Sequence, residues 1–232
     1  MSNGARRNKG GSGEPGLLLR AGLALLLAVV GVGVGLTLFA VPEHPGLATL
    51  VESELGRSGV DNPVTAVLLN FRGYDTLLEI AVLTSALVGV WALGTAPRIR
   101  ETTPSPVLLG LNSILIPLGA LICAYLLWVG AARPGGAFQA GSVLAAVMVL
   151  YILSGRRPRI RLPSAPMRVG AVLGLAVFLA VGIGVKGAGY RLLEYPVELS
   201  GALILLIETA ATISIAVILA GLFIGGRPED EP

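Results

Sequence analysis

Long apolar runs separated by short polar segments dominate the pattern of this chain. Each run has about the 20 residues that a helix needs to cross ~30 Å of hydrocarbon, the fourth being the shortest. Helices are the expected structure because a lone span must satisfy its backbone hydrogen bonds internally. We therefore predict an all-α integral membrane protein with about six transmembrane helices. The runs cover roughly residues 17–41, 75–95, 107–130, 137–154, 168–186 and 198–225.

The segment between the first two runs, residues 42–74, is too long for a simple turn. Its apolar and acidic residues alternate with the spacing of a short amphipathic helix lying on the membrane surface, which Gly56 and Gly59 would end. Residues 63–71 fit either an extended segment or the first turns of the next helix. The apolar face of the short helix would comprise Leu47, Leu50, Val51 and Leu55.

Basic residues are concentrated in alternate connections between the runs. Cytoplasmic loops carry an excess of Lys and Arg, so this alternation predicts that both termini face the cytoplasm. The Gly/Ser-rich residues 1–16 are expected to form a disordered cytoplasmic tail, and residues 227–232 a second tail. The basic clusters are Arg6, Arg7, Lys9 and Arg20; Arg98 and Arg100; and Arg156, Arg157, Arg159, Arg161 and Arg168.

The composition agrees with a membrane protein and excludes several classes of function. Apolar residues make up 54% and charged residues 13% of the chain, against roughly 25% charged in a soluble domain. The net charge of +3 is small, and the arginines lie in short loops, where they set the membrane topology. No nucleic-acid partner is therefore predicted. Cys123 and His44 are single residues of their types without ligand-spaced partners, so we expect no metal and no cofactor. An enzyme is disfavoured because no nucleophile–base pair stands out.

Three ionisable residues, Arg72, Asp75 and Glu79, lie at the mouth of the second run. Helical spacing places Asp75 and Glu79 on one face, with Arg72 three residues before Asp75. An unpaired charge at mid-membrane costs about 2.5–3.5 kcal/mol or more, so such residues usually face protein or a hydrated path. The alternative is an ion pair in the headgroup layer. We expect Glu79 to lie inside a complex, as part of an ion path.

Glu208 lies near the middle of the last run, with Thr212 on the same helical face and Thr209 and Ser214 nearby. A buried carboxyl among hydroxyl groups can stay protonated, pair with a cation or relay protons. The alternative is a protonated glutamic acid that joins helices by hydrogen bonding. Both interpretations remain open from the residues alone.

The sequence Pro134-Gly135-Gly136 separates the third and fourth runs. Glycine tolerates positive φ and proline favours chain reversal, so this sequence predicts a tight structural turn.

Two blocks resemble known membrane proteins. Residues 64–83, VTAVLLNFRGYDTLLEIAVL, resemble the signature VTAI(L/V)xDFRG(F/Y)DTLGE. That signature occurs in the E subunit of membrane-bound, gas-evolving hydrogenases and near the end of the large subunit of Mrp antiporters. Arg72, Asp75 and Glu79 match it, whereas Asn70 and Leu78 replace its Asp and Gly.

From Leu108 onward, four predicted helices and the sequence RPGGAFQAG resemble the B subunit of the Mrp (Mnh) multisubunit Na⁺/H⁺ antiporter, whose loop reads PGGGFxGG. Ala137 and Ala140 stand where the family has glycine. The two resemblances imply a two-helix hydrogenase-E-like region at 17–104, with the outer amphipathic loop, followed by a four-helix B-like domain at 105–226.

The resemblance implies a non-catalytic, multi-pass subunit of a cation/proton-translocating complex in the plasma (inner) membrane. Its partners would be other membrane subunits, the lipid bilayer and Na⁺ or H⁺ as transported ions. The ion-path candidates are Glu79, Asp75, Glu208 and Arg72. The alternative is a purely structural subunit of a hydrogenase-like or other Mrp-related complex.

Overall fold

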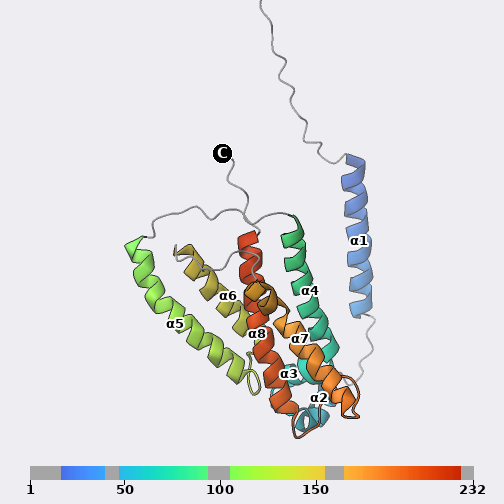
Figure 1. Cartoon of the computed structure of the whole chain (residues 1–232). Helices are drawn as coiled ribbons and strands as arrows, with labels where there is room; N and C mark the ends of the chain where they lie inside the picture. Colours follow the sequence, from blue (N-terminus) through green and yellow to red (C-terminus); the bar gives the residue numbers. More distant parts are fainter. Residues whose placement is uncertain (1–16, 40–46, 94–104, 155–164, 226–232) are drawn as a thin grey trace, which may run out of the picture. The chain divides into compact units, whose positions relative to one another are not determined.

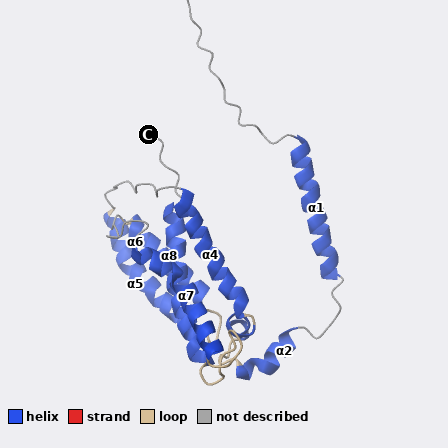
Figure 2. Cartoon of the chain, turned by 45° about the vertical axis from the view of Figure 1, so that its right-hand side comes forward, coloured by secondary structure: helices blue, strands red, loops and turns tan. Residues whose placement is uncertain are grey.

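The computed structural model describes residues 17–39, 47–93, 105–154 and 165–225 (Figures 1 and 2), and within these ranges the chain is helical and contains no strand. The predicted tails at 1–16 and 227–232 lie outside the described residues, as do most of the arginines used to predict topology. The chain divides into two units, residues 1–46 and 47–232.

The first unit contributes one described helix, α1 (Leu17–Phe39). It is apolar on every side, and none of its residues from 21 to 37 is buried. A helix without a polar face is typical of a membrane span.

The second unit contains five long helices, and together with α1 they match the six predicted runs. Helices α4, α5, α7 and α8 are long and apolar enough to cross a membrane, while α6 and the Ala21–Thr37 part of α1 are shorter apolar stretches. An all-α membrane fold is therefore confirmed, and the orientation of its termini stays a prediction. The five helices are α4 (Gly73–Leu93), α5 (Pro106–Val129), α6 (Ala137–Leu153), α7 (Ala165–Gly187) and α8 (Ser200–Gly225).

Helix α8 is the centre of this unit. Helices α4, α6 and α7 pack along it, and α5 packs mainly on α6 (Figure 1). Ile204, Ile207 and Ile215 of α8 join the main core, which also includes Ile80 of α4 and Phe178 of α7. Among the candidate spans α8 is the most buried, so protein covers more of its apolar surface than it does on the other spans.

Small residues allow α7 to approach α8 closely. A Cβ added at Gly174 would lie 2.9 Å from the Cβ of Ser214 and 3.0 Å from the Cα of Ala211. The Ser214 hydroxyl donates to the carbonyl of Ala171 on α7 at 2.5 Å. This combination of close backbone approach and interhelical hydrogen bonding is a common way to join membrane helices.

The predicted short helix is present as α2 (Leu47–Glu54), followed by the 3₁₀ turn η1 (Leu55–Arg57). The chain then reverses at Gly59, whose φ is 79°. A side chain at Gly59 would collide with Ser200 at the start of α8. Only glycine therefore fits this position, both for its backbone conformation and for its close contact.

Residues 63–71, for which the pattern allowed two structures, are helical. The Asn62 side chain accepts from the backbone N–H of Val64 at 3.0 Å and begins α3 (Pro63–Ala66). Proline at the first helical position suits this cap. The chain continues as a π-helical turn, η2 (Val67–Phe71), before α4 begins.

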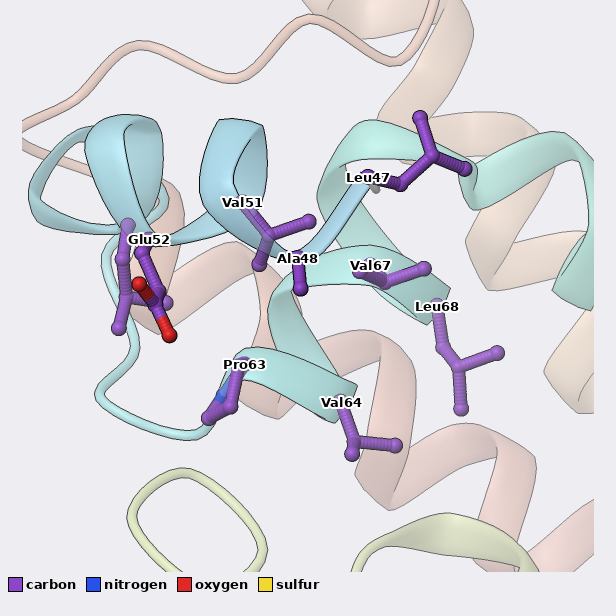
Figure 3. A pocket seen from close by; sticks show the side chains of 9 residues that line it. Leu47, Ala48, Val51, Glu52, Pro63, Val64, Val67 and Leu68 are labelled. Atoms are coloured by element: carbon purple, nitrogen blue, oxygen red, sulfur yellow. The ribbon is translucent and has the colours of Figure 1, made fainter. Parts of the chain in front are cut away.

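An open apolar pocket of about 650 Å³ separates α2 from α3 and η2 (Figure 3). Leu47 and Val51 of α2 line one side, and Val64 and Leu68 line the other. Glu52 is the acidic side chain among the residues that line it.

Candidate functional site

Glu208 is a buried carboxyl inside a helix that is long enough to span a membrane. It lies eight residues after the first residue of α8, or about 12 Å along the helix axis. Its residue is 3% exposed. An ionisable group at such a position is by default a functional candidate, because burial without a role would be costly.

The loop between α5 and α6 brings a helix N-terminus to this carboxyl. The backbone N–H of Ala137, the first residue of α6, donates to Glu208. A Cβ added at Gly136 would lie 2.8 Å from Glu208 Oε1, and Gly136 has φ of 102°. The positive end of the α6 dipole therefore faces the carboxyl, and glycine allows the backbone to come this close.

The loop holds its shape through its own backbone. The N–H of Gly136 donates to the carbonyl of Leu126 at 2.9 Å, and that of Arg133 donates to the carbonyl of Val129 at 2.8 Å. A Cβ at Gly130 would lie 2.6 Å from the nitrogen of Gly136. The Pro134-Gly135-Gly136 sequence thus reverses the chain and also places the start of α6 against Glu208.

Residues 61–65 clamp this loop from the other side. The Asn62 amide donates to the carbonyls of Gly130 and Arg133 at 3.1 and 2.8 Å, and the Thr65 hydroxyl donates to Gly130 at 2.6 Å. The backbone N–H groups of Asp61 and Asn62 both donate to the carbonyl of Ala131 at 2.9 Å. The two motif blocks recognised in the sequence are therefore in direct contact.

The hydroxyl groups that the sequence places near Glu208 do not donate to its carboxyl. The Thr212 hydroxyl donates to the backbone carbonyl of Glu208 at 2.7 Å, and Thr209 donates to Leu205 within α8. Ser214 bonds to α7. In the part of the chain that the structure describes, Glu208 Oε2 is buried and has no hydrogen-bond partner.

Sequence reasoning missed the donors that matter at this carboxyl and at its loop. The N–H of Ala137 and the side chains of Asn62 and Thr65 are distant from Glu208 in the sequence. The signal present in the sequence was a glycine directly before an apolar run, since glycine is one of the residues accepted at a helix N-cap. No residue pattern indicated that Glu208 lies opposite that start.

Arg72 and Asp75 form an ion pair at the start of α4, as their spacing predicts. Glu79 lies one turn further along α4 and is exposed. Among the described residues, no hydrogen bond or ion pair joins Glu79 or the Arg72–Asp75 pair to Glu208. The structure therefore separates the four ion-path candidates into three exposed or half-buried residues at the start of α4 and a buried carboxyl on α8.

Within the described ranges, no three His, Cys, Asp or Glu side chains gather where they could hold a metal ion. The buried Cys123 is a free thiol. Among the described residues, the buried electrostatic arrangement is the carboxyl of Glu208 facing the N-terminus of α6.

Two protein-family models match the chain, in the order predicted from the motifs. Residues 19–106 match a model described as the E subunit of MBH, and residues 107–227 match a domain related to the MnhB subunit of Na⁺/H⁺ antiporters. The second match covers more than half of the chain. The resemblance to hydrogenase-E-type and Mrp-B-type subunits is confirmed, and the exact domain boundaries stay a prediction.

A curated relative is the A/B subunit of a probable K⁺/H⁺ antiporter of Rhizobium meliloti (strain 1021), 30% identical over 206 residues. The match covers 72% of this chain and 20% of that protein, so the chain spans about a fifth of the relative's length.

Two solved structures share the fold. A chain of the membrane-bound sulfane sulfur reductase, an archaeal respiratory membrane complex, is 26% identical with a TM-score of 0.72, covering 90% of this chain and 98% of that one. A chain of the Mrp complex from Dietzia sp. DQ12-45-1b is 20% identical with a TM-score of 0.64. The match covers 95% of this chain and 27% of that one. The second likeness concerns the fold alone.

Proposed function

This chain belongs to the family of domains related to the MnhB subunit of Na⁺/H⁺ antiporters, and from that premise we propose that it is a non-catalytic membrane subunit of a multisubunit cation/proton-translocating complex of the Mrp type. The observation that carries the proposal is Glu208, a carboxyl buried inside a membrane helix and held against the family's glycine-rich loop. An intramembrane carboxyl facing a polar backbone suits a step in an ion path.

In this proposal the chain contributes to subunit packing and to part of an ion path in the plasma membrane. Glu208 is the internal group of that path. The exposed Glu79 and the Arg72–Asp75 pair lie on the surface of α4, where a neighbouring subunit would cover them. The partners are larger membrane subunits and lipid, and the transported ion is Na⁺ or H⁺.

A purely structural subunit of a hydrogenase-like or other Mrp-related complex is the second candidate. It is favoured by the match of residues 19–106 to the MBH family model and by the likeness to a chain of a respiratory complex over 98% of that chain. The exposed position of Glu79 also fits a group that serves only to dock a partner.

Purification of the tagged chain in mild detergent tests whether it is part of a larger complex. We expect it to elute with larger membrane subunits in fixed proportion, and the pure chain in proteoliposomes should not exchange Na⁺ for H⁺. Exchange by the pure chain would contradict the proposal. If ion transport survives neutralisation of both Glu79 and Glu208 while assembly is kept, the structural candidate is correct.

A further inference from the structure

We propose that Glu208, Gly136 and Gln139 form a proton-exchange site at the N-terminus of α6, in which Glu208 binds the proton and Gln139 links it to water. This inference deepens the proposed function, on which it rests, by naming the ion at Glu208. The two oxygens of the Glu208 carboxyl have different surroundings.

On one side, the carboxyl meets the start of α6. The N–H of Ala137 donates to it, and Oε1 lies against the backbone of Gly136. Helix N-termini favour negative charge, so this contact stabilises the ionised form. A neutral glutamic acid also accepts a hydrogen bond from this N–H, but the bond is stronger when the carboxyl is ionised.

On the other side, Oε2 is buried without a partner among the described residues. A carboxylate can accept about four hydrogen bonds, and here the structure supplies one donor. Burial with so few donors disfavours a permanent anion and favours the protonated form. Opposing influences of this kind suit a carboxyl that binds and releases a proton.

A metal cation fits the site less well than a proton, because a hard cation needs several oxygen ligands at once. The nearby carbonyl oxygens already accept hydrogen bonds: Gly130 from Asn62 and Thr65, Leu126 from Gly136, and Glu208 itself from Thr212. No cluster of acidic or histidine side chains is present in the described ranges.

The ionisable side chains on the elements packed around α8 do not occupy the site. Within the described part of the chain, Glu208 makes no ion pair or side-chain hydrogen bond with any of them. These side chains are Tyr74, Asp75 and Glu79 on α4; Cys123 and Tyr125 on α5; Arg133 in the loop; Tyr151 on α6; and Arg168 and Lys186 on α7.

Gln139 connects the carboxyl to the surface. Its side chain is exposed, and a Cβ placed on Gly136 would lie 3.9 Å from Gln139 Oε1 and 2.8 Å from Glu208 Oε1. The amide oxygen and the carboxyl thus flank one glycine, at the end of the helix unit where residues 61–65 clamp the loop. An amide can both donate to and accept from water, so it can hold a water molecule beside the carboxyl.

The exchange step is a simple proton transfer. A hydronium ion gives its proton to the Glu208 carboxylate, which becomes the neutral acid and leaves a water molecule behind. Release is the reverse, and no other bond changes. Gln139 acts as a positioning residue for the water, since its amide does not itself gain or lose the proton.

Infrared difference spectroscopy after a pH step tests this site on the full chain with the subunits that copurify with it. We expect a protonated-carboxyl C=O band that appears on acidification, shifts in D₂O and is absent in Glu208→Gln. The exposed Glu194 provides a matched control, because Glu194→Gln should keep the band. Gln139→Leu should keep the band and slow its appearance several-fold.

Carbodiimide labelling of the unaltered protein, with peptide mass spectrometry, provides a second readout that needs no variant. Labelling at Glu208 should increase on acidification, because the reagent attacks protonated carboxyls. A Glu208 that is protonated at every pH and insensitive to D₂O would overturn the proposal, as would loss of the band on adding NaCl at constant pH. Neither measurement depends on ion transport. Each can therefore contradict the proton-exchange site without contradicting the proposed function.

Discussion

Gly136 is the residue at which the sequence motif, the start of α6 and the buried carboxyl meet. Its φ of 102° and ψ of −173° lie in a region that other residues essentially avoid. The absence of a side chain also leaves room for Glu208 Oε1. One glycine therefore satisfies a backbone requirement and a contact requirement at the same position.

Replacing Gly136 with alanine should lower the free energy of unfolding by about 1–3 kcal/mol, the typical cost of such backbone strain. The added Cβ would also displace Glu208. Denaturant unfolding in detergent measures the change. Gly184→Ala on α7, where a Cβ meets nothing within 4 Å, is the matched control. Equal stability of the two variants would contradict the role given to Gly136.

Tyr195 is a second residue whose position leads to a prediction. It lies in the loop between α7 and α8, is buried, and its hydroxyl has no partner among the described residues. Burial raises the pKa of this hydroxyl above its ordinary value. The unfolded chain then loses the proton at a lower pH than the folded chain, so stability falls as pH rises above about 10.

Tyr195→Phe should therefore remove part of the alkaline loss of stability. At neutral pH it should leave stability equal or slightly higher, since it removes a buried hydroxyl without a partner. Thermal unfolding across the pH range measures both effects, with the exposed Tyr190→Phe as control. A variant that loses stability above a pH of about 10 as steeply as the unaltered chain would contradict this reasoning.

At the scale of elements, the contact between residues 61–65 and the α5–α6 loop links the two motif blocks. The carbonyl of Gly130 accepts from both Asn62 and Thr65. Because the same loop carries Gly136, a change in this clamp should alter how the loop lies against the Glu208 carboxyl. The clamp thus connects the first motif block to the buried carboxyl of the second.

Thr65→Val keeps the shape of the side chain and removes the hydroxyl that donates to Gly130. We expect a loss of about 0.5–1.5 kcal/mol in the free energy of unfolding, the usual net value of such a bond. The control is Thr209→Val on α8, whose exposed hydroxyl bonds within its own helix. If the two variants unfold alike, the clamp contributes nothing to stability.

The sequence was most informative about elements and least informative about contacts. Long apolar runs locate the helices because hydrocarbon crossing sets their length, and the Arg72–Asp75 pair follows from local spacing. Periodicity alone did not decide whether residues 63–71 are extended or helical, although Asn62 followed by Pro63 is a typical helix start. The position of Glu208 opposite Ala137 depends on how α6 and α8 pack, which no local pattern encodes.

At the scale of the whole molecule, the alternation of basic clusters predicts a defined topology. With both termini in the cytoplasm, the connection between α6 and α7 lies inside and the one between α7 and α8 lies outside. After replacement of Cys123, single cysteines at Ser164 and Arg191 report the two sides. A membrane-impermeant maleimide applied from outside should label Arg191→Cys alone. Labelling of Ser164→Cys would contradict the topology.

The most direct test of the central claim is coupled ion movement by the assembled complex carrying Glu208→Gln. Proton movement driven by a cation gradient is measured in membrane vesicles and normalised to subunit content on a native gel. We predict that the complex assembles normally and that coupled transport is lost, while Glu194→Gln transports like the unaltered complex. Full transport in Glu208→Gln at normal assembly would contradict the claim.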